Sequence, residues 1–338
     1  MKILFVKTSA LGDIIHAFTA LAYVRKRFPD AEVDWVVEEP FAELVRAHPG
    51  ITRVYTINSR KWRKSLFSRK SLDAISDFKN QLRENTYDVV FDLQGNIKSG
   101  LVTAVSLSKN KVGFAWKCSP EWPNTLFTNK RFNPPAGKNI REDYLYLVQS
   151  YFQDTAPFEE KGVRLKCSVE GEKQVAEILE HPLLKEKKKV LVCGGSNWKN
   201  KQIPKEALAD FLRKNNTPET AYLFAWGTPQ EKEEAEWLVK QFSECSILLD
   251  RLPLPLLQKL MSAIDLVVSM DSLPLHLCGT TATPTFSFFG PSSAKKYKPL
   301  GAQHQSKQGA CPYGRTFEKR CPVLRTCPTA PCTKSQPL

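Results

Sequence analysis

The residues from Lys2 to Ala22 constrain the fold more than any other part of the chain. A short apolar strand is expected at Ile3–Val6, and it runs into a polar turn that ends in Gly12-Asp13. Apolar residues then recur at helical spacing, at Ile14, Ile15, Phe18, Leu21 and Ala22. A strand, a glycine-containing turn and a helix in this order predict the start of a doubly wound α/β domain. Ligands bind beyond the carboxyl ends of the strands in such domains.

Asp13 is expected at this ligand-facing edge, in the first turn of its helix. A carboxylate is electrostatically favoured there, because the helix dipole is positive at its N-terminus. Asp13 could be a plain helix cap, which spacing alone favours. It could also be a catalytic base directed into a cleft.

Strands and helices alternate along the rest of the chain. In the first half, strands are expected at 33–37, 54–57, 89–92 and 112–114, and helices at 41–47, 71–83, 98–107 and 139–152. In the second half, helices are expected at 170–184 and after 204, 229 and 271, and strands at 189–193, 221–226, 264–270 and 283–288. This alternation predicts an α/β fold of two Rossmann-like parallel-sheet domains. The expected domains are residues 1–156 and 163–294, with a linker near 154–162 and an irregular tail at 295–338.

The chain of 338 residues is long enough for two separate cores. Its net charge of +14 favours anionic partners such as nucleic acid, acidic lipid or phosphorylated small molecules, although a basic surface also serves solubility. Lys7 and Asp13 interrupt the first apolar run, and the longest uncharged run, 272–294, contains prolines and glycines. Neither a secretory signal nor a membrane-spanning helix is therefore expected. The protein is expected in the cytosol or on a membrane surface.

Nine cysteines are present, and Cys311, Cys321, Cys327 and Cys332 cluster in the tail. No pair has the two-residue spacing of a zinc knuckle, so the pattern supports a metal site only weakly. Disulfides or incidental cysteines explain it equally well. The other five are scattered, as in a reduced protein core.

A basic run, Arg60-Lys61-Trp62-Arg63-Lys64, follows the strand expected at 54–57. No acidic residue lies between Glu43 and Asp73. Such a run is usually a solvated face. A loop of Arg, Lys and Trp can also bind several carboxylates or phosphates, or lie on acidic lipid headgroups. Single-stranded nucleic acid is a further alternative, but no nucleic-acid-binding signature is present.

Polar residues follow several other strands. Gln94 follows the strand at 89–92 and is expected beside Asp13. The turn Gly194–Lys201, which carries Ser196 and Asn197, resembles phosphate-binding turns but lacks the Walker order. Glu231 near a helix start could accept hydrogen bonds from ribose hydroxyls, or belong to a solvated face. Asp271-Ser272 could open an anion-binding helix N-terminus, or merely cap that helix with His276 packed inside.

Taken together, these motifs resemble the heptosyltransferases of glycosyltransferase family nine. The matching pieces are Lys7–Asp13 continuing to His16, Asp34–Glu39, Arg60–Lys64, Asp92 to Gly95 with Lys98-Ser99, Trp226–Pro229 with Glu231, Val268–His276, and Phe289–Pro291. The likeness runs from Met1 to about Pro291, and the set is specific although no single piece is.

The resemblance implies a GT-B fold, in which two Rossmann-like domains hold the active site between them. It implies an inverting transfer of heptose from ADP-heptose to the Kdo of lipid A, in lipopolysaccharide inner-core synthesis. The first domain would bind the acceptor and the second the nucleotide sugar. The enzyme would lie on the cytoplasmic face of the inner membrane, with no metal, no cofactor and no nucleic-acid partner.

The resemblance also implies roles for individual residues. Asp13 would be the general base. The acceptor side would comprise Ser9, Arg60, Trp62, Arg63, Lys64 and Gln94. On the donor side, Ser196, Asn197 and Lys201 would face the diphosphate, Glu231 the ribose, Leu252 the adenine and Asp271 the heptose hydroxyls. The diphosphate would also be held by His276 and the backbone N–H groups of Ser272 and Leu273.

The chain departs from the family pattern at Leu273, where the family usually has glycine, and in the two glycines before Ser196-Asn197. These departures leave open a family-nine enzyme with another nucleotide sugar. A polyanion-binding protein without catalytic activity is the alternative from another class. Transfer of a sugar, as opposed to salt-sensitive binding alone, distinguishes the enzymes from it.

Overall fold

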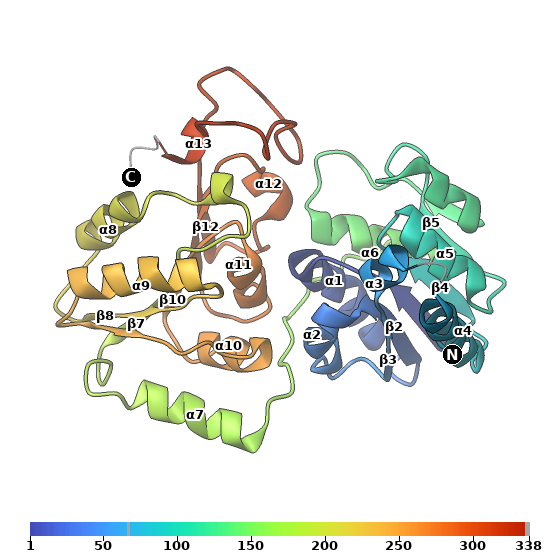
Figure 1. Ribbon diagram of the computed structural model, residues 1–338, viewed down its shortest axis with the longest axis horizontal. Helices are drawn as coiled ribbons and strands as arrows, with labels where there is room; N and C mark the ends of the chain where they lie inside the picture. Colours follow the sequence, from blue (N-terminus) through green and yellow to red (C-terminus); the bar gives the residue numbers. More distant parts are fainter. Residues whose placement is uncertain (66–67, 335–338) are drawn as a thin grey trace. The chain divides into compact units, whose positions relative to one another are not determined.

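The structure is a computed structural model and describes residues 1–65 and 68–334. The chain forms two compact units, Met1–Glu160 and Lys161–Leu338. Each unit is built on one six-stranded sheet with helices around it (Figure 1). All strand pairs within the two sheets are parallel, in agreement with the predicted fold class.

The sheet of unit 1 has the strand order β3-β2-β1-β4-β5-β6. Its strands are β1 (Lys2–Val6), β2 (Glu32–Glu38), β3 (Arg53–Ile57), β4 (Val89–Asp92), β5 (Lys111–Phe114) and β6 (Lys130–Phe132). The chain proceeds from β1 to one side and then returns to place β4 on the other side. The strand order therefore reverses between β1 and β4, which is where a doubly wound sheet binds its ligand.

Helices cover both faces of this sheet. They are α1 (Leu11–Arg27), η1 (Glu39–Phe41), α2 (Ala42–Arg46), α3 (Ser59–Lys64), α4 (Arg69–Arg83), α5 (Ile97–Val105), η2 (Trp122–Phe127) and α6 (Ile140–Tyr151). On one face, Leu4 and Val6 pack with Phe78 of α4 and Val102 of α5. On the other face, α1 packs against α6. Because both faces are covered, β1 and β4 are buried along their apolar lengths and read as continuous apolar runs.

The basic run at 60–64 was expected to be a loop and is instead the short helix α3. Asn58 caps this helix, because its side chain accepts a hydrogen bond from the backbone N–H of Lys61 at 3.2 Å. An Asn that directly follows a strand is a favourable N-cap, and it converts the basic segment into helix.

The sheet of unit 2 has the order β12-β11-β10-β7-β8-β9. Its strands are β7 (Lys188–Cys193), β8 (Thr220–Phe224), β9 (Ser246–Leu248), β10 (Leu266–Met270), β11 (Thr285–Phe289) and β12 (His304–Gln308). The order reverses between β7 and β10, so the ligand edge of this unit lies beyond their carboxyl ends.

The helices of unit 2 pack on this sheet. They are α7 (Val169–Leu179), η3 (Lys199–Lys201), α8 (Lys205–Lys214), α9 (Pro229–Gln241), α10 (Leu254–Met261), α11 (Leu273–Cys278), α12 (Ala294–Tyr297) and α13 (Pro331–Lys334). Leu208 and Leu212 of α8 and Leu238 of α9 join the strand residues in one core cluster. The helix expected at 170–184 ends at Leu179, before Pro182, because a proline disfavours helical backbone at the residue before it.

The tail expected to be irregular from residue 295 contains a strand. β12 pairs in parallel with β11 from Thr285–His304 to Phe289–Gln308. Its sequence, HQSKQ, has no apolar alternation, because this edge strand is held by main-chain hydrogen bonds and is only partly buried. The last residues of the predicted tail, 335–338, lie outside the described residues. In the part of the chain that the structure covers, every helix is too short or too polar to span a bilayer.

Candidate active site

Asp13 lies at the ligand edge of unit 1. It is the third residue of α1, whose N-cap is Ala10, and its side chain is partly exposed. A short loop joins the end of β1 at Val6 to the start of α1 at Leu11, so the carboxylate lies at the carboxyl end of β1, at the reversal between β1 and β4. A negatively charged side chain is electrostatically favourable in the first turn of a helix, because the helix dipole is positive there.

Gln94 ties the loop after β1 to the loop after β4. Its side-chain Oε1 accepts hydrogen bonds from the backbone N–H groups of Thr8 at 3.1 Å and Ser9 at 3.0 Å. Gln94 therefore lies beside the Asp13 loop, as its place after the strand indicated. One amide oxygen fixes the backbone that leads into α1.

Asp92 in turn holds the loop that carries Gln94. It is fully buried, and it accepts hydrogen bonds from the N–H groups of Gln94 and Gly95, from Ser99 Oγ at 2.8 Å and from Asn124 Nδ2 at 2.6 Å. Burial raises the pKa of Asp92, and these hydrogen bonds act against that rise. Asp92 is a structural residue, and it fixes the polar loop.

The helix α3 presents exposed cations at the end of β3. Arg60, Arg63 and Lys64 are exposed. The Trp62 ring instead packs inward against Phe78, with ring centroids 5.9 Å apart. Of the predicted acceptor residues on α3, the three cations are open to an anionic ligand, while Trp62 anchors the helix to the core.

Glu38 at the end of β2 connects α3 with α5. Its carboxylate accepts hydrogen bonds from Ser59 Oγ and Ser59 N–H, the latter at 3.2 Å, and pairs with Lys98 Nζ at 2.6 Å. Glu38 is buried, and this contact set was not predicted from the sequence. Its position at a strand's carboxyl end, like those of Asp92 and Gln94, was the available signal.

In unit 2, three polar side chains meet around Asp271, which follows β10 and is 3% exposed. Lys201 Nζ lies 2.5 Å from Asp271 Oδ2, and His276 Nε2 lies 3.3 Å from Asp271 Oδ1. Ser292 Oγ also donates to Asp271 Oδ2. We call Lys201, Asp271, His276 and Ser292 the Asp271 cluster.

The Asp271 cluster keeps its carboxylate ionised. Burial by itself would raise the pKa of Asp271. The hydrogen bond from His276 and the positive charge of Lys201 outweigh burial, and they hold the pKa well below its usual range. Three of the four residues were candidates from the sequence. Ser292 was missed, although it too follows a strand end, two residues after Gly290.

The segment Ser272–Leu273 begins α11. Ser272 is the N-cap, and its side chain makes no capping hydrogen bond. Leu273, where the family has glycine, is the first helical residue and has no left-handed backbone. A side chain is therefore sterically compatible with the backbone there. Pro274 at the second position contributes no N–H group to this helix start.

The turn after β7 lies against Glu231 at the start of α9. Glu231 Oε2 accepts from the N–H groups of Gly227 at 2.8 Å and Thr228 at 3.1 Å, within a capping box. A Cβ on Gly195 would lie 2.2 Å from Glu231 Cδ, so the turn needs glycine there for this close approach. Ser196 is buried, and Gln202 Nε2 donates to its carbonyl oxygen at 2.8 Å.

The remaining donor-side candidates are distributed along the same edge of the sheet. Asn197 is exposed beside Ser196. Leu252 is partly exposed, between β9 and α10, two strands away from β7. Together with the Asp271 cluster after β10, these residues follow the strand ends from β10 through β7 and β8 to β9.

Each unit thus has one ligand edge with a different chemistry. Unit 1 presents a carboxylate at a helix start and a basic helix. Unit 2 presents a buried carboxylate paired with a cation, beside a glycine turn. Over residues 1–65 and 68–334, no three His, Cys, Asp or Glu side chains are placed as ligands of one metal ion.

Comparisons with known proteins agree with this picture. The sequence profile of glycosyltransferase family 9 (heptosyltransferase) matches residues 75–326. Lipopolysaccharide heptosyltransferase 1 of Campylobacter coli is 30% identical over 308 residues, which cover 88% of this chain and 87% of that protein. The enzyme of the same name from Pseudomonas aeruginosa is 29% identical over 294 residues, covering 87% and 79%.

The fold has a close match among solved structures. The structure of the Escherichia coli heptosyltransferase WaaC with ADP superposes with a TM-score of 0.77 at 25% identity, covering 90% of this chain and 92% of that one. These similarities confirm the resemblance seen in the motifs, which is greatest to heptosyltransferase I. The chain belongs to glycosyltransferase family 9, the heptosyltransferases, and is a glycosyltransferase of GT-B fold.

Proposed function

We propose that the protein transfers heptose from ADP-heptose to a Kdo residue of lipid A, with inversion at the anomeric carbon. In this proposal residues 1–156, within unit 1, bind the acceptor, and residues 163–294, within unit 2, bind the donor. The Asp271 cluster carries the proposal, because it places a buried, ionised carboxylate and a lysine at the ligand edge of unit 2. Similarity to heptosyltransferases solved with ADP and with ADP-2-deoxy-2-fluoro heptose supports this donor.

The proposed reaction is a single displacement. The acceptor hydroxyl oxygen attacks the anomeric carbon of the heptose, and its proton passes to the carboxylate of Asp13. The bond from the anomeric carbon to the phosphate oxygen breaks, and ADP leaves with the electron pair. Because the leaving diphosphate gains negative charge, preorganised cations and N–H groups stabilise the transition state. So good a leaving group needs no separate acid, whereas a glycosidase uses two carboxyl groups.

Donor recognition follows from the edge of unit 2. Asp271, already held by Lys201, accepts hydrogen bonds from heptose hydroxyls, and Lys201 faces the diphosphate. The diphosphate is further bound by Ser196, Asn197, His276 and the backbone N–H groups of Ser272 and Leu273. Glu231 accepts from the ribose hydroxyls and Leu252 contacts the adenine. Neither a metal ion nor a cofactor takes part in the transfer.

Acceptor recognition follows from α3 and the loop that Gln94 holds. Arg60, Arg63 and Lys64 are exposed and bind the Kdo carboxylates and lipid A phosphates. Trp62 keeps α3 in place through its contact with Phe78. Ser9 and Gln94 form the floor of the site beside Asp13.

An exposed aromatic patch supports a location on the inner membrane surface, facing the cytoplasm. Trp116 and Trp122 are 64% and 52% exposed, with ring centroids 5.0 Å apart, and Leu126 of η2 is 71% exposed. Tryptophan is favoured where a membrane meets water, and cations such as the neighbouring Lys117 are attracted to anionic headgroups. We expect binding to anionic vesicles to weaken in Trp116→Ala combined with Leu126→Ala, as measured by vesicle flotation.

A transfer assay with ADP-heptose and Kdo-lipid A tests the proposed reaction. Wild type should transfer heptose, and Asp13→Asn should lower kcat about 10²- to 10⁴-fold with little change in donor KM, as removal of a general base does. Addition of Mg²⁺ should leave the rate unchanged. Equal turnover by both proteins would refute Asp13 as the base. Transfer from a different nucleotide sugar in preference to ADP-heptose would retain the family and overturn the proposed donor.

A further inference from the structure

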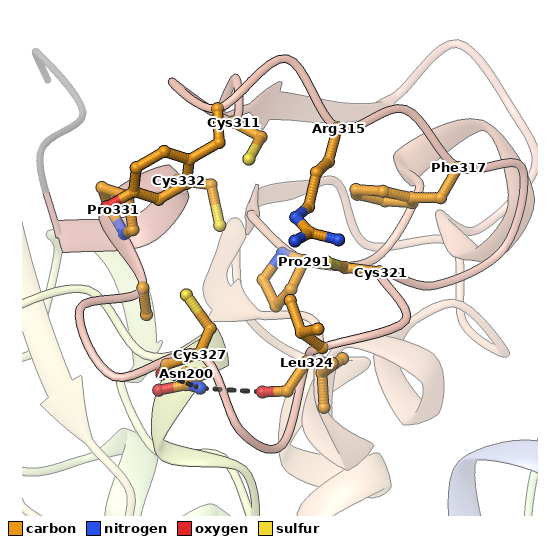
Figure 2. Close-up of a pocket in the computed structure, with 13 residues that line it drawn as sticks. Asn200, Pro291, Cys311, Arg315, Phe317, Cys321, Leu324, Cys327, Pro331 and Cys332 are labelled. Carbon is orange, nitrogen blue, oxygen red and sulfur yellow. Dashed lines mark hydrogen bonds between the residues drawn. The ribbon is translucent and has the colours of Figure 1, made fainter.

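The four tail cysteines, scattered over 22 residues of sequence, lie around one pocket in unit 2. Cys311, Cys321, Cys327 and Cys332 all line it, together with Arg315 (Figure 2). The figure shows the Arg315 side chain pointing toward the space among the cysteines. We call these four residues the four-cysteine pocket. None of the nine cysteines of the chain, all within the described residues, is in a disulfide.

The segment that carries this pocket has a repeated local design. Cys311, Cys321 and Cys327 are each followed directly by proline, which restricts the cysteine backbone to extended conformations. Turns follow the first two, with Gly314 N–H donating to Cys311 O at 3.0 Å and Leu324 N–H to Cys321 O at 3.1 Å. Cys311 and Cys321 therefore each occupy the first position of a tight turn.

The same segment has almost no core of its own. Between residues 309 and 334, the buried side chains are Leu324, Ala330 and Thr333. Regular structure in this stretch is confined to the short helix α13. A loop-rich segment without a hydrophobic core is ordinarily held by disulfides or by a metal ion.

The charges around the pocket suit a group of thiolates. Residues 311–334 contain five basic side chains, Arg315, Lys319, Arg320, Arg325 and Lys334, and one acidic side chain, Glu318. Arg315 forms no ion pair within the described residues.

We propose that the four-cysteine pocket binds one thiophilic transition-metal ion, with Zn²⁺ or iron as the candidates. Binding of M²⁺ replaces four thiol protons with four metal–sulfur bonds and leaves a centre of net charge −2, which Arg315 and its basic neighbours offset. In the described residues no three of the sulfurs are placed as ligands of one metal ion, so binding requires the turns that carry them to move closer together.

The centre would brace both loops of the proposed donor site. Asn200 of η3 donates through Nδ2 to the carbonyl oxygens of Leu324 at 2.7 Å and Cys327 at 3.0 Å. On the other side, the N–H of Cys321 donates to Pro291 O at 2.7 Å, next to Ser292 of the Asp271 cluster. The tail thus holds the loop that contains Lys201 and the loop that contains Ser292. This consequence rests on the proposed donor role of those loops.

Metal analysis of the full chain tests the site directly. The protein is purified anaerobically under reducing conditions, and its zinc and iron are measured by mass spectrometry, before and after incubation with Zn²⁺ and desalting. We expect about one metal ion per chain. Each of the variants Cys311→Ser, Cys321→Ser, Cys327→Ser and Cys332→Ser should lower the metal content severalfold. Cys245→Ser, a partly buried cysteine elsewhere in unit 2, is the matched control and should keep the metal.

Three results would overturn the site. The first is wild type that holds no metal even after incubation with Zn²⁺. The second is alkylation and peptide mapping that finds the four cysteines joined in disulfides in freshly isolated protein. The third is serine variants that bind as much metal as wild type. If the variants lose the metal but donor KM does not rise severalfold, the bracing is refuted. If wild type binds metal but transfers no heptose, the proposed function fails and the site stands.

Discussion

The buried ion pair between Lys201 and Asp271 makes Lys201→Met the most informative change to the stability of unit 2. Both side chains are at least nine-tenths buried, and their charged atoms are 2.5 Å apart. Methionine keeps much of the lysine's length and apolar contact but removes the charge. The variant therefore isolates what the cation contributes to holding Asp271.

The expected cost follows from the geometry. At an effective dielectric constant of about 20, unit charges at this separation attract by roughly 7 kcal/mol. Burial of the lysine ammonium group costs several kcal/mol of desolvation in the wild type, and the variant avoids this cost. Removal of one partner from a buried pair costs about 3–5 kcal/mol. Because His276 and Ser292 still contact Asp271, we expect a loss near the lower end, about 3 kcal/mol of unfolding free energy.

Amide hydrogen exchange of β7 and β10 measures this loss within unit 2, independently of unit 1. The matched control is Lys232→Met on α9, which breaks an exposed pair with Glu236 at 3.8 Å and should cost less than about 1 kcal/mol. If Lys201→Met destabilises β7 and β10 no more than the control does, the pair is effectively solvated. Lys201 would then contribute nothing measurable to holding Asp271.

Three further predictions follow from other contacts. Gly195→Ala should push Glu231 out of its capping box, which should lower the unfolding free energy by about 1 kcal/mol and raise the donor KM. Gly194→Ala is the control and should have a smaller effect, because its Cβ would meet only the flexible end of the Leu208 side chain, at 3.1 Å. Equal effects of the two variants would contradict this prediction. Gln94→Leu should lower kcat, because it removes the acceptor for the backbone N–H groups of Thr8 and Ser9. Gln94→Glu keeps an acceptor oxygen and should retain most of the wild-type kcat. Equal kcat values for the two variants would refute the role of Gln94 in holding this loop. Because folding depresses the pKa of Asp271, its stabilisation should be complete above its unfolded value of about 3.9 and decline as the pH falls below that. The difference in unfolding free energy between wild type and Asp271→Asn should therefore shrink in acid, and a difference that stays constant down to pH 3 would exclude this coupling.

Much of the fold could be predicted because its signals are local. β4 was expected at 89–92 and is Val89–Asp92. A short apolar run bounded by polar residues favours a buried strand and fixes where that strand ends. The short strands β6, β9 and β12 were not predicted. Each has three to five residues, and all three lie at sheet edges, where main-chain pairing rather than an apolar pattern holds the strand.

The candidate site divides in the same way. Residues such as Asp13, Gln94 and Asp271 could be selected from the sequence because parallel strands bring their carboxyl ends to one edge of a sheet. Which of these residues contact one another could not be selected. Trp62 was predicted on the acceptor side; only the structure shows that its partly buried ring also packs on Phe78, since burial of aromatic surface stabilises such a contact.

The sequence by itself determined the two α/β units, the family and the set of polar residues at the strand ends, because periodicity, turns and motifs are written in neighbouring residues. Only the tertiary structure decided that Lys201 pairs with Asp271, 70 residues away, and that the cysteine-rich tail docks on the loop at Asn200, more than 120 residues before it. Such contacts depend on how distant segments share a desolvated space. There the loss of hydration has to be offset by a specific partner, and no local pattern in the chain records which partner that is.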